Sequence, residues 1–159
     1  MTILSGGCQC GAVRFSCDGD KVAVVSICHC RMCQKAVGGY FAPFATLLPG
    51  ALTWTRGERR RFRSSGNVAR GFCADCGTPL TYEADGCEPS IAAGAFDDPA
   101  ALPPTVQYGV EAELPFTATL STLKRVRTDE GFEGADFADD IVSNQHPDHD
   151  TPVWPLPKA

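Results

Sequence analysis

Seven cysteines in three short clusters constrain this chain more than any other feature. The clusters hold two, three and two cysteines separated by one or two residues, and such close spacing is typical of metal ligands. A closed structural zinc site has four ligands, whereas a catalytic one commonly has three protein ligands and an open position. Seven thiolates therefore divide naturally into four and three. The clusters are Cys8-Gln9-Cys10, Cys28-His29-Cys30-Arg31-Met32-Cys33 and Cys73-Ala74-Asp75-Cys76.

The simplest division joins the two paired clusters around one zinc ion. Each pair is followed directly by glycine, at Gly11 and Gly77. Glycine readily adopts the positive φ that folds backbone amides around a metal-bound sulfur, so Cys-Gly knuckles indicate a closed site. This predicts a structural zinc site formed by Cys8, Cys10, Cys73 and Cys76.

The remaining triplet, Cys28, Cys30 and Cys33, would hold a second zinc ion with an open position. The chain continues into residues 34–36, Gln-Lys-Ala, which can start a helical turn. Such a turn would place Cys33 near a helix N-terminus, where a thiolate is favoured. We therefore expect the reactive centre at this triplet.

A second structural zinc is the alternative interpretation of the triplet. Its fourth ligand would come from Cys17, Cys87 or His29. His29 lies between two ligands in the sequence, and we expect its ring to point away from the metal.

The composition indicates one globular domain in a reducing compartment. A chain of 159 residues with 43% hydrophobic content is long enough for a single core. Nine cysteines are compatible with a secreted disulfide scaffold, but the odd number, the spacing and the absence of a signal peptide favour ligands. No apolar run approaches the roughly 20 residues of a membrane span. We expect a cytoplasmic protein that does not associate with membranes.

Charge separates a weakly basic body from an acidic end. The formal net charge is −5, and residues 129–159 alone carry eight acidic residues and one lysine. We expect residues 1–127 to form the zinc-binding domain and residues 128–159 to form an acidic C-terminal extension. In that extension His146 and His149 are expected to be solvated.

Three aromatic residues of the extension suggest that it packs on the body or on a partner. They are Phe132, Phe137 and Trp154. We nevertheless expect the core to fold without the extension, because its sequence is poor in periodic patterns.

The positive charge of the body is concentrated in five arginines. Such a stretch can meet an anionic substrate or a nucleic acid, although a strand edge protected by charge has the same pattern. No aromatic stacking pattern accompanies the arginines, which argues against nucleic-acid binding. They are Arg56, Arg59, Arg60, Arg61 and Arg63.

Short apolar or alternating segments between turn residues predict a mainly β domain. Residues 11–16 and 21–27 are expected to form a first hairpin through the turn Cys17-Asp18-Gly19-Asp20. Helical turns are expected at residues 31–37 and 97–102. Further strands are predicted at residues 40–48, 52–54, 59–63, 68–72, 79–83, 90–95, 106–110 and 116–126.

The order of the motifs resembles the glutathione-dependent formaldehyde-activating enzyme family, which is shared with centromere protein V. The similarity extends over about residues 5–126. It implies a β-tent fold of coiled antiparallel sheets stapled by zinc, with one or two short helical turns. The motifs are Gly7-Cys8-Gln9-Cys10-Gly11, Cys28-His29-Cys30-Arg31-Met32-Cys33-Gln34-Lys35, Gly38-Gly39-Tyr40-Phe41, Ser65-Gly66-Asn67 and Arg70-Gly71-Phe72-Cys73-Ala74-Asp75-Cys76-Gly77-Thr78-Pro79-Leu80.

The resemblance also implies an activity, that of a zinc-dependent carbon–sulfur lyase similar to S-(hydroxymethyl)glutathione synthase. Its partners would be a thiol such as glutathione and a small aldehyde such as formaldehyde, with Cys28, Cys30 and Cys33 as the catalytic metal ligands. Arg70, Lys35 and the arginines near residue 60 are candidates to hold the carboxylates of glutathione.

Two positions of this sequence depart from the family pattern. Relatives commonly have His where Gln107 stands and Trp where Phe116 stands. The first difference would change an acid/base group, and the second would change the shape of a pocket.

Two other functions remain open. One is a non-catalytic zinc module that binds a protein or nucleic acid through the basic stretch. The other is a redox enzyme similar to methionine sulfoxide reductase B, for which Cys87 is the late candidate nucleophile. The sequence around Cys87 lacks a recognisable Arg or His setting, which favours an inert thiol. Under any of these functions the chain could also form a homo-oligomer.

Overall fold

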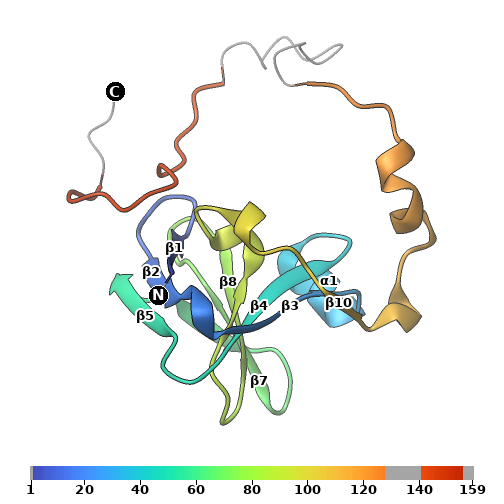
Figure 1. The fold of residues 1–159 in the computed structure, drawn as a ribbon, viewed down its shortest axis with the longest axis horizontal. Helices are drawn as coiled ribbons and strands as arrows, with labels where there is room; N and C mark the ends of the chain where they lie inside the picture. Colours follow the sequence, from blue (N-terminus) through green and yellow to red (C-terminus); the bar gives the residue numbers. More distant parts are fainter. Residues whose placement is uncertain (1, 128–140, 156–159) are drawn as a thin grey trace.

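The computed structural model describes residues 2–127 and 141–155. In these residues the chain forms two β-sheets, one short α-helix and several 3₁₀ turns (Figure 1). The prediction of a mainly β fold is confirmed. Within the same residues, no helix has the length and apolar character needed to cross a bilayer.

The smaller sheet is antiparallel and contains three strands in the order β1-β2-β5. Phe15 on the central strand is fully buried. Its ring makes edge-on contacts with Trp54 at 5.9 Å and with Phe96 at 5.1 Å between centroids, so this sheet is anchored by an aromatic cluster. The strands are β1 (Ile3–Gly7), β2 (Arg14–Asp18) and β5 (Leu52–Arg56).

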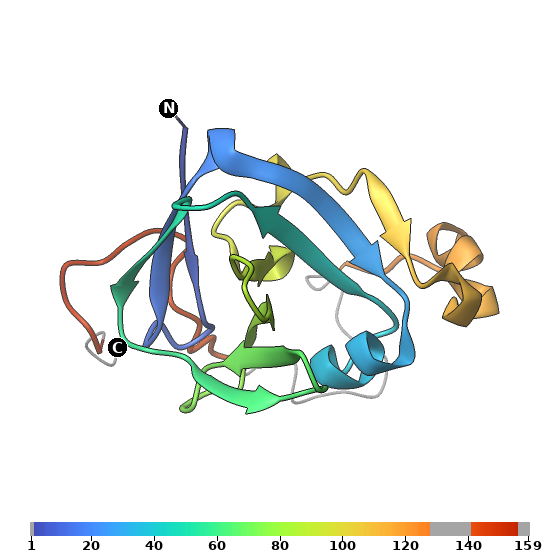
Figure 2. The same ribbon diagram turned by 90° about the horizontal axis from the view of Figure 1, so that it is seen from below.

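The larger sheet has seven strands in the order β10-β3-β4-β9-β8-β7-β6. All neighbours are antiparallel except β10, which pairs in parallel with β3. In Figure 2 the long strands β3 and β4 lie side by side and lead to the helix α1 at one end. The strands are β3 (Val22–Cys28), β4 (Ala42–Leu47), β6 (Arg60–Arg63), β7 (Val68–Phe72), β8 (Pro79–Ala84), β9 (Ser90–Ala92) and β10 (Val106–Tyr108).

The main core lies between the two sheets. Phe15 packs there with Leu80 of β8 and Ile91 of β9, all fully buried. Gly6 makes an isolated bridge to Phe96, and a Cβ at Gly6 would lie 2.4 Å from the carbonyl oxygen of Ala95. The close approach of these segments therefore requires glycine at this position.

The helical prediction at residues 31–37 is confirmed, because α1 spans Arg31–Val37. Gly38 ends the helix in the left-handed conformation with φ of 67°, as glycine commonly does. The second predicted turn is a 3₁₀ turn at Pro99–Ala101, capped by the side chain of Asp98.

The expected hairpin between residues 11–16 and 21–27 is wrong. The two segments are β2 and β3, which are consecutive in the chain but lie in different sheets. Asp18 and Gly19 do not form a tight hairpin turn, because the Asp18 side chain instead caps a 3₁₀ turn at Gly19–Lys21. The partners of β2 are β1, which the sequence did not reveal as a strand, and β5.

The strand predicted at residues 116–126 is also wrong. Pro115–Thr122 forms a 3₁₀ helix (η5) instead. Thr117, Thr119 and Thr122 each donate a hydroxyl hydrogen bond to the carbonyl three residues earlier, which supports turns rather than an extended strand. None of the residues of η5 is buried, and Figure 1 shows it projecting from the body.

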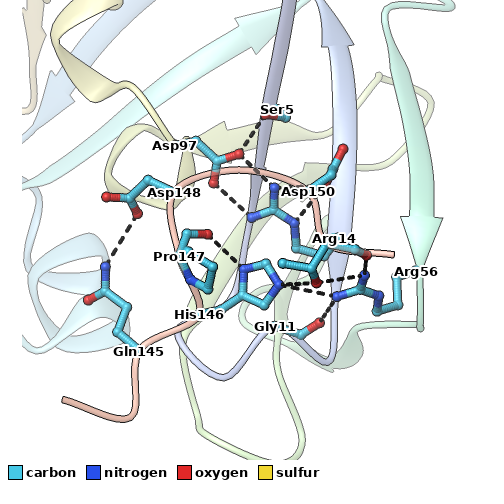
Figure 3. Close-up of polar contacts among 11 residues, drawn as sticks. Ser5, Gly11, Arg14, Arg56, Asp97, Gln145, His146, Pro147, Asp148 and Asp150 are labelled. Atoms are coloured by element: carbon cyan, nitrogen blue, oxygen red, sulfur yellow. Dashed lines mark hydrogen bonds and ion pairs between the residues drawn. The ribbon is translucent and has the colours of Figure 1, made fainter. Parts of the chain in front are cut away.

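A C-terminal strap, residues 145–154, packs against the smaller sheet (Figure 3). The expectation that His146 is solvated is wrong, because the residue is 4% exposed and its backbone N–H donates to the Gln9 carbonyl at 2.7 Å. Trp154 Nε1 donates to the Cys10 carbonyl at 2.8 Å. His149 is exposed as expected, while Phe132 and Phe137 lie outside the described residues.

Ion pairs join the strap to the body. Arg14, 2% exposed, makes two hydrogen bonds to Asp97, at 2.7 and 2.6 Å, and two to Asp150 of the strap, at 2.9 and 2.7 Å. Arg56 donates to the Thr151 carbonyl at 2.5 Å. Figure 3 shows both guanidinium groups between the sheet and the strap.

Candidate metal centres

The four cysteines of the two paired clusters meet at one place. Their sulfurs all lie within 4.8 Å of one another. One pair comes from the turn between β1 and β2, and the other from the turn between β7 and β8, so this four-cysteine cluster links the smaller sheet to the larger one. Its members are Cys8, Cys10, Cys73 and Cys76.

The distances within the four-cysteine cluster suit a tetrahedral metal. Zinc–sulfur bonds of about 2.3 Å in a tetrahedron place the sulfurs about 3.8 Å apart. The Cys8 and Cys10 sulfurs are 3.5 Å apart, and those of Cys10 and Cys73 are 3.8 Å apart. All nine cysteines are free thiols.

Both paired clusters form the expected glycine knuckles. Gly11 and Gly77 each have φ of 78°. The turns point donors at the sulfurs: Val13 N–H donates to Cys8 Sγ at 3.2 Å, and Thr78 Oγ1 lies 3.1 Å from Cys76 Sγ. Hydrogen bonds within these two turns thus orient the Cys8 and Cys76 thiols.

Charge within this cluster is uneven. Burial raises the pKa of Cys10 and of Cys73. Burial would also raise the pKa of Cys76, but hydrogen bonds from Thr78 outweigh it and lower that pKa to about 6. Neighbouring thiols cannot all ionise alone, and a bound cation is the group that would let them do so.

The triplet forms a second, three-cysteine cluster, Cys28, Cys30 and Cys33, with sulfurs within 4.8 Å of one another. Cys28 is the last residue of β3, Cys30 caps α1, and Cys33 lies in the first turn of that helix. The Cys33 N–H donates to Cys30 Sγ at 3.4 Å. Burial raises the pKa of Cys28 to about 12, whereas hydrogen bonding from Cys33 outweighs burial and lowers the pKa of Cys30.

The strand β10 covers one side of this cluster. Tyr108 pairs with Cys28 in the sheet and accepts a hydrogen bond from the backbone N–H of His29 at 2.8 Å. Gly109 has φ of 65°, and a Cβ there would lie 2.8 Å from the backbone nitrogen of Cys30. The chain therefore passes too close to the cluster for any residue larger than glycine.

All three cysteines line one cavity of about 280 Å³. On β3, Ser26 and Cys28 lie on the same face because side chains alternate along a strand. Sequence reasoning named Arg70 but overlooked the hydroxyl-bearing residues of this cavity, although that alternation indicates Ser26. The other lining residues are Met32, Phe44, Thr46, Arg70, Tyr82, Ser90 and Tyr108.

The structure does not offer the triplet a fourth ligand among the described residues. Cys17 is buried and its thiol faces the Asp18 carbonyl, while Cys87 is exposed. His29 is buried, and its Nε2 lies 2.7 Å from Gln107 Oε1. None of these three joins the cluster, whereas all three clustered cysteines line the cavity.

The arginines near residue 60 point elsewhere. Arg59 and Arg61 pair with Glu83, and Arg63 pairs with Asp85. These carboxylates offset the basic stretch, which weakens the nucleic-acid interpretation. Of the proposed glutathione contacts, Arg70 alone lines the cavity, whereas Lys35 lies in a separate groove beside Tyr40.

Comparison with known proteins agrees with this geometry. A family model for the glutathione-dependent formaldehyde-activating enzyme matches residues 3–111. The chain belongs to this family. The matched region contains all seven clustered cysteines and Gln107, but it ends before η5 and the strap.

A solved structure shares the family fold. It is the crystal structure of a Rhodobacter sphaeroides protein determined in a structural genomics programme, and it superposes with a TM-score of 0.52 at 22% sequence identity. The alignment covers 65% of this chain and 98% of that chain. At this level of identity the similarity shows the fold alone.

Proposed function

We propose that this protein is a carbon–sulfur lyase that acts on the adduct of a small aldehyde with glutathione or another thiol. Two zinc ions would be held per chain, a structural one by the four-cysteine cluster and one of catalytic type by the three-cysteine cluster. Family membership supports a thiol and formaldehyde as reactants. The cavity lined by the three-cysteine cluster is the site at which these two reactants would bind.

The donor sets of both clusters fit zinc. Four close thiols complete a tetrahedron, and three leave one position for another ligand. A zinc ion at the three-cysteine cluster would supply a Lewis acid that lowers the pKa of a thiol entering that position.

One observation carries the proposal: the three cysteines share a cavity and have no fourth partner of their own among the described His, Cys, Asp and Glu residues. The cavity volume of about 280 Å³ is near the lower end for small-molecule sites. It therefore suits the sulfur and the one-carbon group of an adduct, with the rest of the thiol compound extending through the mouth.

The cavity walls supply groups for the reacting oxygen. In the release direction the carbon–sulfur bond breaks, sulfur keeps the electron pair, and the hydroxyl proton is transferred to it, giving thiol and formaldehyde. Five hydroxyl-bearing residues of the described chain line the cavity and could donate to that oxygen: Ser26, Thr46, Tyr82, Ser90 and Tyr108. Thr46 and Ser90 are hydrogen-bonded to each other at 3.2 Å, which orients both.

No histidine among the described residues lines this cavity. The Nε2 atom of His29 lies 2.7 Å from Gln107 Oε1, and His146 is hydrogen-bonded within the strap. The proposed chemistry therefore depends on the three cysteines rather than on an imidazole base.

The test is exchange NMR of glutathione and formaldehyde, followed by other small aldehydes, with zinc-loaded protein. We expect wild-type protein and Cys87→Ser, which changes an exposed thiol outside both clusters, to accelerate exchange equally. Cys30→Ser should abolish the acceleration while retaining the fold. Equal acceleration by Cys30→Ser would refute the proposal. Loss in Cys87→Ser would favour the redox interpretation, and no acceleration with any aldehyde would favour a binding module.

A further inference from the structure

One buried guanidinium lies beside the three-cysteine cluster. Arg70, on β7, is 5% exposed, and its Nη2 donates to Cys33 Sγ at 3.3 Å. Its Nε donates to Ser64 Oγ at 3.0 Å. The guanidinium carbon lies over the Tyr82 ring, 5.1 Å from its centroid. These three contacts fix the guanidinium against the cluster.

Arg70 differs from the other buried arginine in its choice of partner. Arg14 pairs with two carboxylates, whereas Arg70 has no ion pair with any Asp or Glu of the described chain. The two cavities that Arg70 borders contain no acidic residue in their described walls. A buried charge without a counter-charge is strongly unfavourable, so the positive charge of Arg70 must be balanced by another group.

The three neighbouring cysteines would be that group once they hold a zinc ion as thiolates. Three cysteine thiolates and one Zn²⁺ have a formal charge of minus one. The charge of Arg70 brings the total to zero. Without Arg70, a fourth thiolate would bind to a centre that already has a net negative charge. Like charges within bonding distance of one metal ion repel strongly inside a protein.

We infer that Arg70 is the counter-ion of the three-cysteine cluster and the positioning residue that allows an anionic ligand to occupy its open position. It acts through Cys33 and through the charge it adds at the cavity wall. The identity of that ligand as a substrate thiolate rests on the proposed function, whereas the charge pairing rests on the contact between Arg70 and Cys33 and on a metal ion bound by the three thiolates.

Arginine suits this task better than lysine. Its planar fork donates to Ser64 and Cys33 at once and stacks on Tyr82. Hydrogen bonds from a charged donor are roughly twice as strong as neutral ones. Lysine would keep the charge, but its single ammonium nitrogen lacks the planar fork that reaches Ser64 and Cys33 together and stacks on Tyr82.

The test uses full-length protein loaded with Co²⁺, whose absorption reports the ligands of each cluster. The four-cysteine cluster already has a complete ligand set and serves as an internal control for folding and metal loading. Two ligands are titrated into the open position, thiocyanate as a small anion and imidazole as a neutral ligand. Glutathione is titrated separately.

Arg70→Gln should weaken thiocyanate binding by about tenfold or more relative to wild type, and imidazole binding by less than about twofold. Arg70→Lys should keep the ratio of the two affinities within about threefold of wild type. The matched control is Arg63→Gln, which removes an exposed arginine paired with Asp85 and should change neither affinity.

Ser64→Asp provides a second variant in case Arg70→Gln does not fold. A carboxylate beside Nε would neutralise Arg70 without removing it, and Ser64→Asn is its uncharged control. We expect Ser64→Asp to weaken thiocyanate binding selectively and Ser64→Asn to have a much smaller effect.

Equal loss of thiocyanate and imidazole binding in the Arg70 variants would show a merely structural role and overturn the inference, as would failure of wild-type protein to bind any anion. Selective, Arg70-dependent binding of thiocyanate without binding of glutathione would support the inference and count against the proposed function. The two ideas therefore fail separately.

Discussion

The ion pairs around Arg14 should contribute very unequally to stability. The Asp97 side chain is 12% exposed, whereas that of Asp150 is 54% exposed, although both accept short hydrogen bonds from Arg14. Replacing Arg14 with Met leaves Asp97 nearly buried with Ser5 as its remaining side-chain donor, at 2.5 Å. Replacing Asp150 with Asn removes only the exposed partner (Figure 3).

The expected magnitudes follow from burial. Breaking a buried pair and leaving one charge uncompensated costs about 3–5 kcal/mol of unfolding free energy. Loss of a solvent-exposed pair costs about 1 kcal/mol or less. We therefore expect Arg14→Met to lower the unfolding free energy by about 3 kcal/mol or more, and Asp150→Asn to lower it by about 1 kcal/mol at most.

Urea unfolding of zinc-loaded, full-length protein at pH 7 measures both effects. Arg63→Met is the matched control, because Arg63 and Asp85 form a pair in which both side chains are more than half exposed, so its loss should change the unfolding free energy little. If Arg14→Met cost no more than this control, the reasoning from burial would be refuted.

Three further predictions concern the metals, the strap and pH. Metal analysis of purified protein should give two zinc ions of unequal lability. Cys73→Ser should prevent folding, because structural zinc contributes on the order of 10 kcal/mol to folding, whereas Cys30→Ser should leave a folded chain. One zinc ion per chain, or equal insolubility of the two variants, would contradict this prediction. Gly11→Ala should lower the thermal midpoint and release Trp154 of the strap from the Cys10 turn, as read by fluorescence, because Gly11 has φ of 78° and a Cβ there would lie 2.2 Å from the His146 ring. An unchanged midpoint would show that the strap adapts. Burial would raise the pKa of Asp97, but hydrogen bonds from Arg14 outweigh this and lower it, so the stability that Asp97 contributes is complete above an unfolded-state pKa of about 3.9 and is lost as pH falls through the lower folded-state pKa. The difference in unfolding free energy between wild type and Asp97→Asn should therefore be constant from about pH 7 to 5 and shrink below about pH 4. A difference that grew on acidification would contradict this direction.

The strap changes how the C-terminal extension is understood. The sequence indicated loose, solvated chain around His146, yet that residue is buried and the segment contacts the turn that carries Cys8 and Cys10. Removal of residues 145–159 would therefore expose the side of the four-cysteine cluster that Trp154 covers.

Sequence alone determined the features that depend on neighbouring residues. Cysteine spacing separated a set of four from a set of three, and the glycines at 11 and 77 have the positive φ that the knuckles predicted. The helix Arg31–Val37 was predicted with the same bounds that the structure shows. Spacing, glycine conformation and capping act within a few residues, so they can be inferred without knowing the fold.

Tertiary structure decided which distant groups meet. The local pattern around β2 fits a hairpin with β3, but β2 pairs with β1 and β5, and Phe15 on it is fully buried. Among the arginines considered for binding, Arg70 alone reaches the cavity, because its position on β7 places it beside Cys33 of α1, 37 residues earlier in the chain. Strand pairing and the burial of charge depend on contacts between residues far apart in sequence, and no local pattern specifies them.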